Sequence, residues 1–320
     1  MPIITIFGAT GSQGTSDCLN FDAILNVNLG SSVLNAVLAD GRYTPRAVSR
    51  SLNSDASKAL IAKGIEVVKA DLSDIEALKT AMRGSEAVFG VTNFWDPAVF
   101  PADPHGKAEI TQGKNLVDAV KAVGVKFFIW SSLPNATKTS NGLCKHIYHF
   151  DNKAIVEDYL RASGVPHAVL LTGWFAENLW KVGSMQKTDT GYTIPTPKFG
   201  PQDTQAATWV ARDLGAAAMA LLSNYTDPSK GVLGSSYPVI SMRFTYPQFA
   251  KAIATALKKE VTSPTPQTSG LADLDEMFLY QAKIGMYVDT PVPNPALVAL
   301  GMKFGTMEEF IKTEVVPRFA

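Results

Sequence analysis

The N-terminal strand and the glycine-rich turn after it constrain the fold of this chain most. Residues 3–7 (IITIF) are mostly apolar, and residues 8–14 (GATGSQG) place glycine at the first, fourth and seventh positions. In such a turn the first glycine lets the chain leave the strand, the second lets backbone approach a phosphate, and the third lets a helix pack closely on the strand. Free N–H groups at the start of that helix favour an anion. The segment predicts a site for a dinucleotide pyrophosphate; a plain turn is the alternative.

Short apolar segments alternate with segments of helical period through the first half of the chain. Apolar residues recur at helical spacing in residues 75–82 and 116–123. Alternating strands and helices with right-handed crossovers predict an α/β fold, a doubly wound parallel sheet of the Rossmann type. We expect its strands at residues 3–7, 45–50, 65–72, 86–93, 126–133 and 167–173.

The pattern changes after residue 173. Glycine and proline become frequent in residues 193–203, and residues 246–259 predict a helix with no strand rhythm around it. We therefore expect a dinucleotide-binding domain at 1–173 and a smaller, mostly helical lobe at 174–320, with a few strands returning to the sheet. The boundary is soft, because the sixth strand and the loop after it belong to both parts. A small-molecule substrate would bind in the cleft between the lobes.

The composition narrows the class of protein. The chain has 320 residues, with 29 Lys and Arg against 29 Asp and Glu, so its charge favours neither nucleic acid nor an anionic membrane. Only Cys18 and Cys144 are present, which is no disulfide framework and indicates a reducing compartment such as the cytoplasm. No apolar run is long enough for a membrane span. The four histidines do not lie at zinc-ligand spacings, so we expect no metal site; they are His105, His146, His149 and His167.

The end of the second predicted strand bears on the choice of cofactor. A site that prefers NAD places Asp or Glu there for the ribose 2′-hydroxyl. This chain has Ser49-Arg50-Ser51 instead. The guanidinium of Arg50 suits a 2′-phosphate, which favours NADP(H). The alternative is an exposed arginine at a strand end.

Residues 15–30 (TSDCLNFDAILNVNLG) lengthen the unit between the turn and Arg50. Arg50 lies 36 positions beyond Gly14, whereas the residue that reads the ribose usually lies about 20 positions beyond the turn. Without Thr15–Gly30 the chain passes from Gly14 to Ser31 and Ser32, which would cap an amphipathic helix. The segment therefore resembles an insertion, for which we consider an unspliced intron or mispredicted exon first and a lineage-specific insertion second.

Together, several motifs resemble the NmrA-like branch of the atypical short-chain dehydrogenases. They include GATGSQG, VSR, KADLSD, VTNFW, QGKNLVDAVKAVGVKFFIWSSLPN, HFDNKAIVEDYLRASGVP and GWFAENL. The resemblance covers nearly the whole chain outside Thr15–Gly30 and is strongest before Leu179. It implies a Rossmann domain that binds NADP(H) and a smaller C-terminal lobe. Some such proteins reduce small molecules, and others are redox-sensing regulators that bind the cofactor without turning it over.

The resemblance also implies cofactor contacts near the first three strands. The pyrophosphate would be held by the turn, at Gly8, Ala9, Thr10, Gly11, Ser12, Gln13 and Gly14. Arg50 would meet the 2′-phosphate, and Asp71 and Leu72 would flank the adenine.

Further contacts are implied at the nicotinamide end. Its lining would come from Thr92, Asn93 and Phe94. Lys153 would reach the nicotinamide ribose. The site would be closed over by Phe175, Ala176, Glu177 and Asn178. Ligands of open α/β sheets bind at the ends of strands, which agrees with these positions.

The catalytic pair of typical short-chain dehydrogenases is out of register here. In those enzymes a tyrosine lies four residues before the lysine, on the same helix face. Here His149 lies four residues before Lys153, and Tyr148 lies five before it. His149 could act as the acid beside Lys153, because its ordinary pKa suits proton transfer; a structural role is the alternative.

Two functions follow from these features. The first is an NADP(H)-dependent reductase of a small, aromatic or secondary metabolite. The second is a non-catalytic NADP(H) sensor that regulates a protein partner. Trp95 and Trp174 lie just past their strands and are the better candidates for a pocket, whereas Phe128 and Trp130 are expected in the core.

Overall fold

A seven-stranded parallel sheet forms the centre of the computed structural model, which describes residues 1–10, 29–97 and 99–320. The strand order is β11-β6-β5-β4-β1-β2-β3, with all neighbours parallel. The strands are β1 (Ile3–Ile6), β2 (Thr44–Ser49), β3 (Glu66–Lys69), β4 (Ser85–Gly90), β5 (Phe127–Ser132), β6 (His167–Thr172) and β11 (Ser236–Val239). All six strands that we predicted are present, five of them shorter than expected and β2 shifted by one residue, and the predicted doubly wound α/β fold is confirmed.

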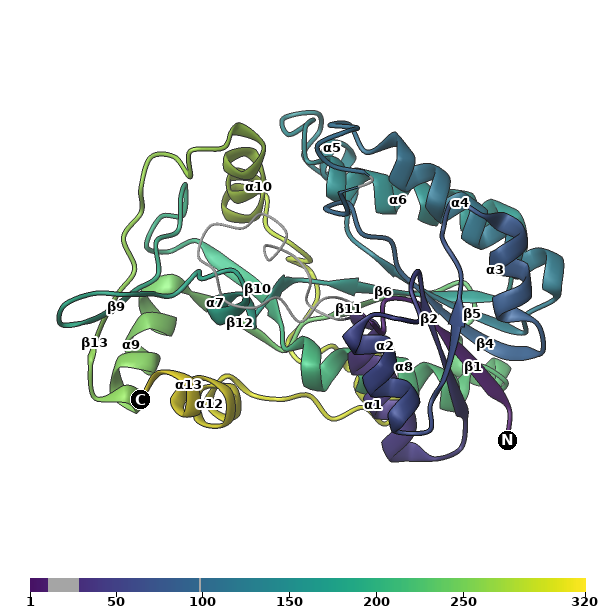
Figure 1. Ribbon diagram of the computed structural model, residues 1–320. Coiled ribbons are helices and arrows are strands. Elements are labelled where there is room, and N and C mark those ends of the chain that lie inside the picture. Colours follow the sequence, from purple (N-terminus) through teal and green to yellow (C-terminus); the bar gives the residue numbers. More distant parts are fainter. Residues whose placement is uncertain (11–28, 98) are drawn as a thin grey trace.

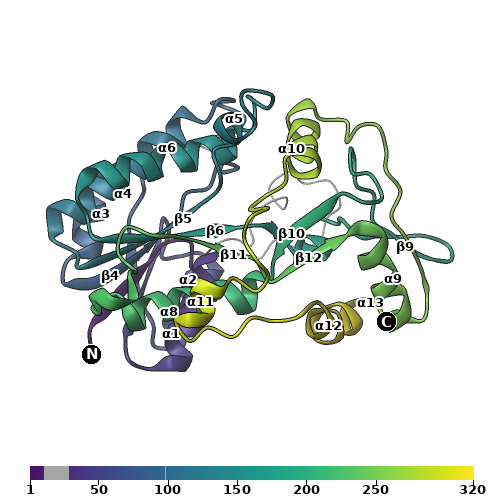
Figure 2. The same cartoon turned by 180° about the vertical axis from the view of Figure 1, so that it is seen from behind.

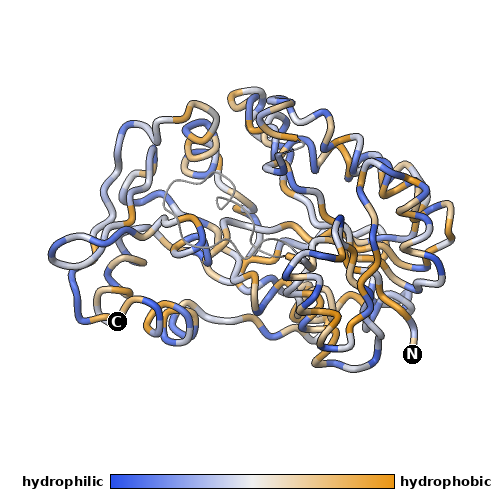
Figure 3. The backbone as a smooth tube through the Cα atoms, in the orientation of Figure 1, coloured by the Kyte–Doolittle hydropathy of each residue, from blue (hydrophilic) through white to orange (hydrophobic). Residues whose placement is uncertain are grey.

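Helices cover both faces of this sheet (Figure 1). One face carries α3 (Ile75–Met82), α4 (Lys107–Val123) and α6 (Tyr148–Ser163), with the short helix α5 (Ala136–Thr139) beside α6. The other face carries α1 (Leu29–Asp40), α2 (Asp55–Ala62) and α8 (Gly215–Asn224), as the view from behind also shows (Figure 2). Parallel strands covered on both faces are apolar throughout. All six residues of β5 are accordingly buried, and apolar residues concentrate in the central strands (Figure 3).

The C-terminal part adds two small sheets and several helices. One sheet has the order β12-β10-β7 and the other β13-β9-β8. Their strands are β7 (Trp174–Phe175), β8 (Gln186–Lys187), β9 (Gly191–Thr193), β10 (Thr204–Thr208), β12 (Met242–Thr245) and β13 (Glu260–Thr262). The helices are α7 (Asn178–Lys181), the π-helix η2 (Val210–Leu214), the 3₁₀ turn η3 (Pro228–Lys230), α9 (Tyr246–Leu257), α10 (Ala272–Lys283), α11 (Pro295–Ala299), α12 (Met307–Phe310), the π-helix η4 (Ile311–Val315) and α13 (Val316–Phe319). Helix α9 matches the predicted helix at 246–259.

Two C-terminal elements lie with the N-terminal part. Strand β11 pairs with β6, and the apolar face of α8 packs in one core with α1. The fold therefore has no clean break at residue 173. The division into a cofactor part at 1–173 and a substrate part at 174–320 stays a prediction. Among the described residues, no helix is both long and apolar enough to span a bilayer.

Ser32, which we considered as a cap, has a different role in the full chain. The cap that we predicted at Ser31 and Ser32 applies to the chain without Thr15–Gly30; in the full chain α1 includes Leu29, and Ser32 lies inside it. The Ser32 hydroxyl donates to the carbonyl of Val210 at 2.6 Å and accepts from the N–H of Gly215 at 3.0 Å. In the full chain this serine therefore joins α1 to the start of α8, and the cap in the shortened chain stays a prediction.

Gly30 performs the close packing that we predicted for Gly14, which lies outside the described residues. A Cβ atom on Gly30 would lie 2.2 Å from the carbonyl oxygen of Phe7 and 2.6 Å from the nitrogen of Ala9. Only glycine therefore allows α1 to approach the end of β1. Removing residues 15–30 or residues 14–29 leaves the same chain, in which one glycine precedes Ser31.

We predict that the variant lacking Thr15–Gly30 folds and melts at a temperature at least as high as the full chain. The variant keeps a glycine at the contact between α1 and β1, and a shorter connection loses less entropy on folding. Calorimetry on both proteins tests this.

The matched control is Gly14→Ala in the shortened chain. Its methyl group would meet backbone atoms, so it should lower the free energy of unfolding by about 1–3 kcal/mol. A shortened chain that melts well below the full chain would show that residues 15–30 support the fold.

Candidate functional site

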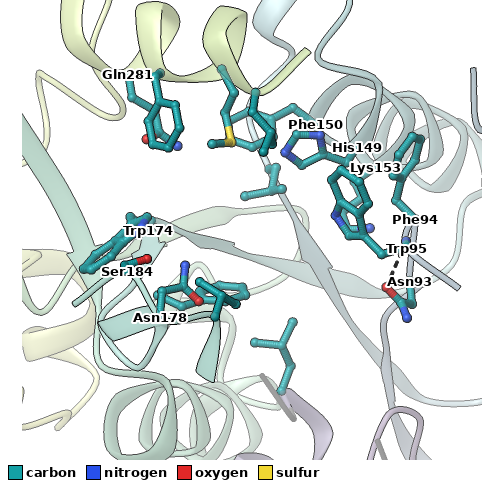
Figure 4. Close-up of a pocket in the computed structure, with 18 of the residues that line it drawn as sticks. Asn93, Phe94, Trp95, His149, Phe150, Lys153, Trp174, Asn178, Ser184 and Gln281 are labelled. Carbon is teal, nitrogen blue, oxygen red and sulfur yellow. Dashed lines mark hydrogen bonds between the residues drawn. The ribbon is translucent and has the colours of Figure 1, made fainter. Parts of the chain in front are cut away.

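A cavity of about 190 Å³ opens at the carboxyl edge of the central sheet. From β1 the chain runs outward through β2 and β3 and then crosses to β4 on the other side of β1, and ligands of open α/β sheets bind at such a switch point. Both parts of the chain line the cavity (Figure 4). The described lining residues are Leu29, Thr92, Asn93, Phe94, Trp95, Leu133, His149, Phe150, Lys153, Gly173, Trp174, Phe175, Asn178, Val182, Ser184, Leu274, Met277, Phe278 and Gln281. Within the described ranges, no three His, Cys, Asp or Glu side chains gather as metal ligands.

A buried ion pair lies at the end of β4. The ammonium group of Lys153 donates to a carboxylate oxygen of Glu109 and, at 3.1 Å, to the carbonyl of Thr92. The Thr92 hydroxyl donates to the same Glu109 oxygen at 2.7 Å, and Asn152 donates to the other at 3.4 Å. Glu109 is fully buried. Four polar side chains, from α4, α6 and the segment just after β4, therefore hold one another in place.

Sequence reasoning missed Glu109, although the helical period carries a signal for it. Along α4, Glu109 shares the buried face with Gly113, Leu116 and Val120. A carboxylate on such a face needs a charged partner. Gly113 brings that partner close, because a Cβ atom there would lie 2.4 Å from Val156 of α6. The close approach of α4 and α6 places Lys153 against Glu109.

Aromatic rings surround His149 at the first turn of α6. Its ring lies 5.8 Å from Phe94, 5.5 Å from Trp95 and 4.8 Å from Phe150, measured between centroids. Burial among these rings, with a smaller contribution from the charge of Lys153, lowers the pKa of His149 to about 3. The imidazole is therefore neutral at physiological pH, which weighs against the predicted role of His149 as an acid.

Tyr148 lies away from the cavity, as its register suggested. It is absent from the described lining, and its ring packs against His105 at 4.8 Å. The two tryptophans that we favoured for the pocket, Trp95 and Trp174, both line it. Phe128 and Trp130 are fully buried in the core, as expected.

The wall opposite Lys153 comes from the C-terminal part. Trp174, Asn178 and Ser184 lie on one side of it. Helix α10 completes it with residues at helical spacing, Leu274, Met277, Phe278 and Gln281. Sequence reasoning did not identify this helix as part of the site, although three apolar residues and one glutamine share one stripe.

The residues carried over to the nicotinamide end divide into two groups. Those that line the cavity are Thr92, Asn93, Phe94, Lys153, Phe175 and Asn178. Ala176 instead packs in the C-terminal core. Glu177 accepts from the N–H groups of Val210 and Ala211 at 3.2 and 2.8 Å, at the start of η2. Burial raises the pKa of Glu177 to about 7, against the effect of those N–H groups.

The residues carried over to the adenosine end lie outside the cavity. The guanidinium of Arg50 forms an ion pair with Asp96 at 2.6 Å and its side chain is 60% exposed. Asp71 accepts from the N–H of Ser73 at 2.8 Å, and the carbonyl of Leu72 accepts from Asn115 at 3.0 Å. Their contacts with a cofactor stay predictions.

Only part of the glycine-rich turn is described. Gly8 has φ of +74°, a conformation that favours glycine, and a Cβ atom there would lie 2.9 Å from Val91. Ala9 is buried in the core shared with α1, and Thr10 is half-buried. Gly11, Ser12, Gln13 and Gly14 lie outside the described residues.

We predict that Glu109→Gln lowers the free energy of unfolding by about 3 kcal/mol, because it leaves a buried ammonium without a carboxylate. The double variant Glu109→Gln/Lys153→Met should recover much of this loss, because no buried charge remains. Denaturant unfolding of the wild type, both single variants and the double variant gives the coupling. Additive effects of the two substitutions on the free energy of unfolding would contradict a stabilising interaction between Glu109 and Lys153.

We also predict a pH effect on stability from His149. Its pKa is about 3 in the folded protein and about 6.5 in an unfolded chain. Below pH 6.5 the unfolded chain therefore binds a proton that the folded chain does not, so acid destabilises the fold. Between pH 7 and 5 the contribution is a loss of about 2 kcal/mol.

Denaturant unfolding at pH 7 and pH 5 measures this loss. In His149→Phe the loss between the two pH values should shrink by that amount. An equal loss in the wild type and the variant would show that His149 keeps its ordinary pKa.

Comparison with known proteins agrees with this architecture. The NmrA-like family matches residues 28–311. The NmrA-like family domain-containing oxidoreductase ptmS of Penicillium ochrochloron is 27% identical over 293 residues, covering 86% of this chain and 82% of that protein.

Solved structures share the fold. The negative transcriptional regulator NmrA in complex with NADP superposes with a TM-score of 0.72 at 19% identity, covering 99% of this chain and 95% of the other. The NADPH-dependent quinone oxidoreductase QOR2 of Escherichia coli, complexed with NADPH, gives a TM-score of 0.70 at 23% identity, covering 96% and 98%. The match over most of the chain, on this fold and around this cavity, shows that the protein belongs to the NmrA-like family.

Proposed function

We propose that the protein binds NADP(H) at the carboxyl edge of the central sheet and reduces a small, uncharged metabolite in the cavity. One observation carries this proposal. The cavity joins the switch point of the sheet, where a dinucleotide would lie, to a wall of apolar and aromatic side chains from the C-terminal part. In open α/β proteins such a junction is where a cofactor and a small molecule meet.

The residues that are described fit a dinucleotide. Gly8 and Gly30 let α1 start against the end of β1 with no side chain between them. Arg50 is exposed at the end of β2, where a 2′-phosphate would lie. Thr92, Asn93 and Lys153 would meet the nicotinamide ribose and amide. NADPH, when bound, supplies a hydride.

The remaining residues have two roles. They hold Lys153 in place, and they exclude water from the cavity wall. Glu109 and Thr92 hold the Lys153 ammonium at a fixed place on the cavity wall. The rings of Phe94, Trp95 and Phe150 enclose the neutral imidazole of His149. A dry wall of this kind favours an apolar substrate.

The names of similar proteins support a reductase. The relative from Penicillium ochrochloron is named an oxidoreductase, and the structure from Escherichia coli is a quinone oxidoreductase with NADPH bound. A secondary metabolite as substrate is the expectation from the sequence.

A second function, an NADP(H) sensor that regulates a protein partner, is favoured by a separate observation. The tyrosine of the usual catalytic pair lies outside the cavity lining, and the histidine in its register carries a lowered pKa. The superposed NmrA is a negative transcriptional regulator with NADP bound.

An assay of NADPH oxidation separates the two functions. The full chain and the variant lacking Thr15–Gly30 are incubated with NADPH and a panel of quinones and uncharged aromatic carbonyl compounds. Turnover in either protein supports a reductase. NADPH binding without turnover of any compound supports the sensor. From the sequence we expect the shortened variant to bind NADPH more tightly, because the phosphate turn is then continuous with α1; equal affinity would contradict this.

We predict that Arg50→Ala weakens NADPH binding about 10- to 150-fold, the equivalent of about 1.5–3 kcal/mol for a charge-assisted contact. NADH binding should change little, because NADH lacks the 2′-phosphate. Fluorescence titration with both cofactors measures the difference, in whichever of the two chains binds NADPH.

The matched control is Arg42→Ala. Arg42 is similarly exposed and pairs with Asp40 at the same distance, 2.6 Å, but at the end of α1. It should leave both affinities unchanged. Equal losses for NADPH and NADH in Arg50→Ala would contradict a phosphate contact.

We predict that the double variant Glu109→Gln/Lys153→Met folds but loses turnover by about 100-fold or more. The double variant separates the role of Lys153 in the cavity from the cost of an unpaired Glu109. Tyr148→Phe is the control and should keep activity, because Tyr148 lies outside the described lining. Loss of activity in Tyr148→Phe alone would show that the tyrosine reaches the substrate.

A further inference from the structure

The imidazole of His149 brings polar atoms to the cavity that the described residues do not satisfy. Its ring projects from the first turn of α6 toward the space between the two walls of the cavity (Figure 4), and the side chain is half-buried. The neighbouring rings of Phe94, Trp95 and Phe150 pack against it, and no hydrogen bond joins it to a described residue. Its nitrogens are therefore left to water or to a ligand in the cavity.

A ring nitrogen without a partner does not by itself mark a ligand site. Nε2 of His167 also has no described partner, but this atom is sealed from solvent at the start of β6, at the amino edge of the sheet. His167 does not belong to the described lining, so a ligand in the cavity does not meet it. His149 differs, because its ring lines the cavity and its nitrogens are not among the sealed atoms.

The charge state of His149 determines what it offers to a ligand. Burial among the rings keeps the pKa of His149 at about 3, so the imidazole is neutral and carries one N–H donor. The first turn of a helix also disfavours a positive charge on this side chain. A donor without charge suits an uncharged oxygen, whereas a carboxylate would enter an aromatic wall without a cation to balance it.

Lys153 is already engaged by the protein. Its ammonium donates to Glu109 and, at 3.1 and 3.3 Å, to the carbonyl and the hydroxyl of Thr92. A hydrogen bond from Lys153 to a substrate would compete with these bonds, whereas one from His149 would replace only water. His149 lies four residues before Lys153, so both side chains project from the same helix face. An oxygen bound by His149 would lie beside the wall where we place the nicotinamide.

We propose that His149 donates its N–H to the oxygen of a flat, uncharged carbonyl substrate and thereby holds the carbonyl carbon near the nicotinamide. The proposal rests on the proposed function, because it names a substrate contact and the substrate class of the same cavity. The class comprises aryl ketones, aromatic aldehydes and quinones, whose reducible group is also a hydrogen-bond acceptor.

This contact assists reduction without a proton leaving the imidazole. During reduction the carbonyl oxygen becomes more negative, so a donor at that oxygen binds the transition state more tightly than the ground state. Water supplies the proton that completes the hydroxyl group of the product. His149 thus binds the substrate as a neutral donor, a role that differs from the acid first considered for it.

The test uses two probes of the same shape, acetophenone and α-methylstyrene, which differ in a carbonyl oxygen against a methylene group. Ligand-detected NMR titration of the full chain gives both affinities without cofactor or turnover. The quantity compared between proteins is the affinity for acetophenone divided by the affinity for α-methylstyrene. This ratio removes the contribution of the shared ring and reports the contact at the oxygen.

His149→Phe keeps a flat ring and removes the donor. We expect it to lower the ratio about fivefold or more, the equivalent of one net hydrogen bond. The affinity for α-methylstyrene should stay the same or rise, which shows that the cavity is intact. The matched control is His105→Phe, because His105 also packs on an aromatic ring but lies outside the described lining; it should keep the ratio. An unchanged ratio in His149→Phe, an equal fall in His105→Phe, or no binding of acetophenone to the wild type would overturn the proposal.

NADPH oxidation in the same proteins keeps this proposal separate from the proposed function. A fall of the ratio in His149→Phe supports the contact even where no compound is reduced, in which case the reductase fails alone. Where a carbonyl compound is reduced, His149→Phe should lower kcat/KM about tenfold or more. Equal kcat/KM in the wild type and His149→Phe would support the reductase and overturn the contact.

Discussion

The buried ion pair between Lys153 and Glu109 fixes the geometry on which the rest of the site depends. A carboxylate that is fully buried on the apolar face of α4 is stable only with a cationic partner and further hydrogen bonds. Lys153 reaches it because Gly113 lets α6 approach α4, and Thr92 ties both groups to the end of β4. The pair thus sets the distance between the sheet and the two helices that form one wall of the cavity.

This pair also determines what the cavity can bind. With the charge of Lys153 compensated by Glu109 and His149 held neutral by the surrounding rings, the described lining presents aromatic faces and neutral polar groups. The opposite wall, from α7 and α10, supplies apolar side chains and the carboxamides of Asn178 and Gln281. One wall therefore suits the cofactor, whereas the other suits a flat, largely apolar substrate. These are complementary parts of one site between two portions of the chain.

Much of this arrangement could be predicted from the sequence, because strands buried on both faces are continuous apolar segments. All six predicted strands are present, and Trp95 and Trp174 reach the cavity as expected from their places just past strand ends. Glu109 and Gln281 were missed because helical period assigns their positions to the core, and only the partner across the fold distinguishes a site residue from a core residue. Ser31 and Ser32 satisfied the local pattern of a cap, but a tertiary contact with the start of α8 determines where Ser32 lies. The packing role expected for Gly14 is performed by Gly30. In the chain without Thr15–Gly30, Gly14 would precede Ser31, as Gly30 does in the full chain.

The central claim is that cofactor and substrate share this cavity, with the nicotinamide beside the wall of Lys153 and a flat aromatic ligand beside the wall of α10. An inter-ligand nuclear Overhauser effect between NADP+ and 2-naphthol, measured in the presence of the protein, tests it most directly. We predict magnetisation transfer between the nicotinamide protons and the naphthol ring, and none to the adenine protons, because the adenosine end would lie toward Arg50. Binding of both ligands without transfer, or displacement of one ligand by the other, would contradict the account.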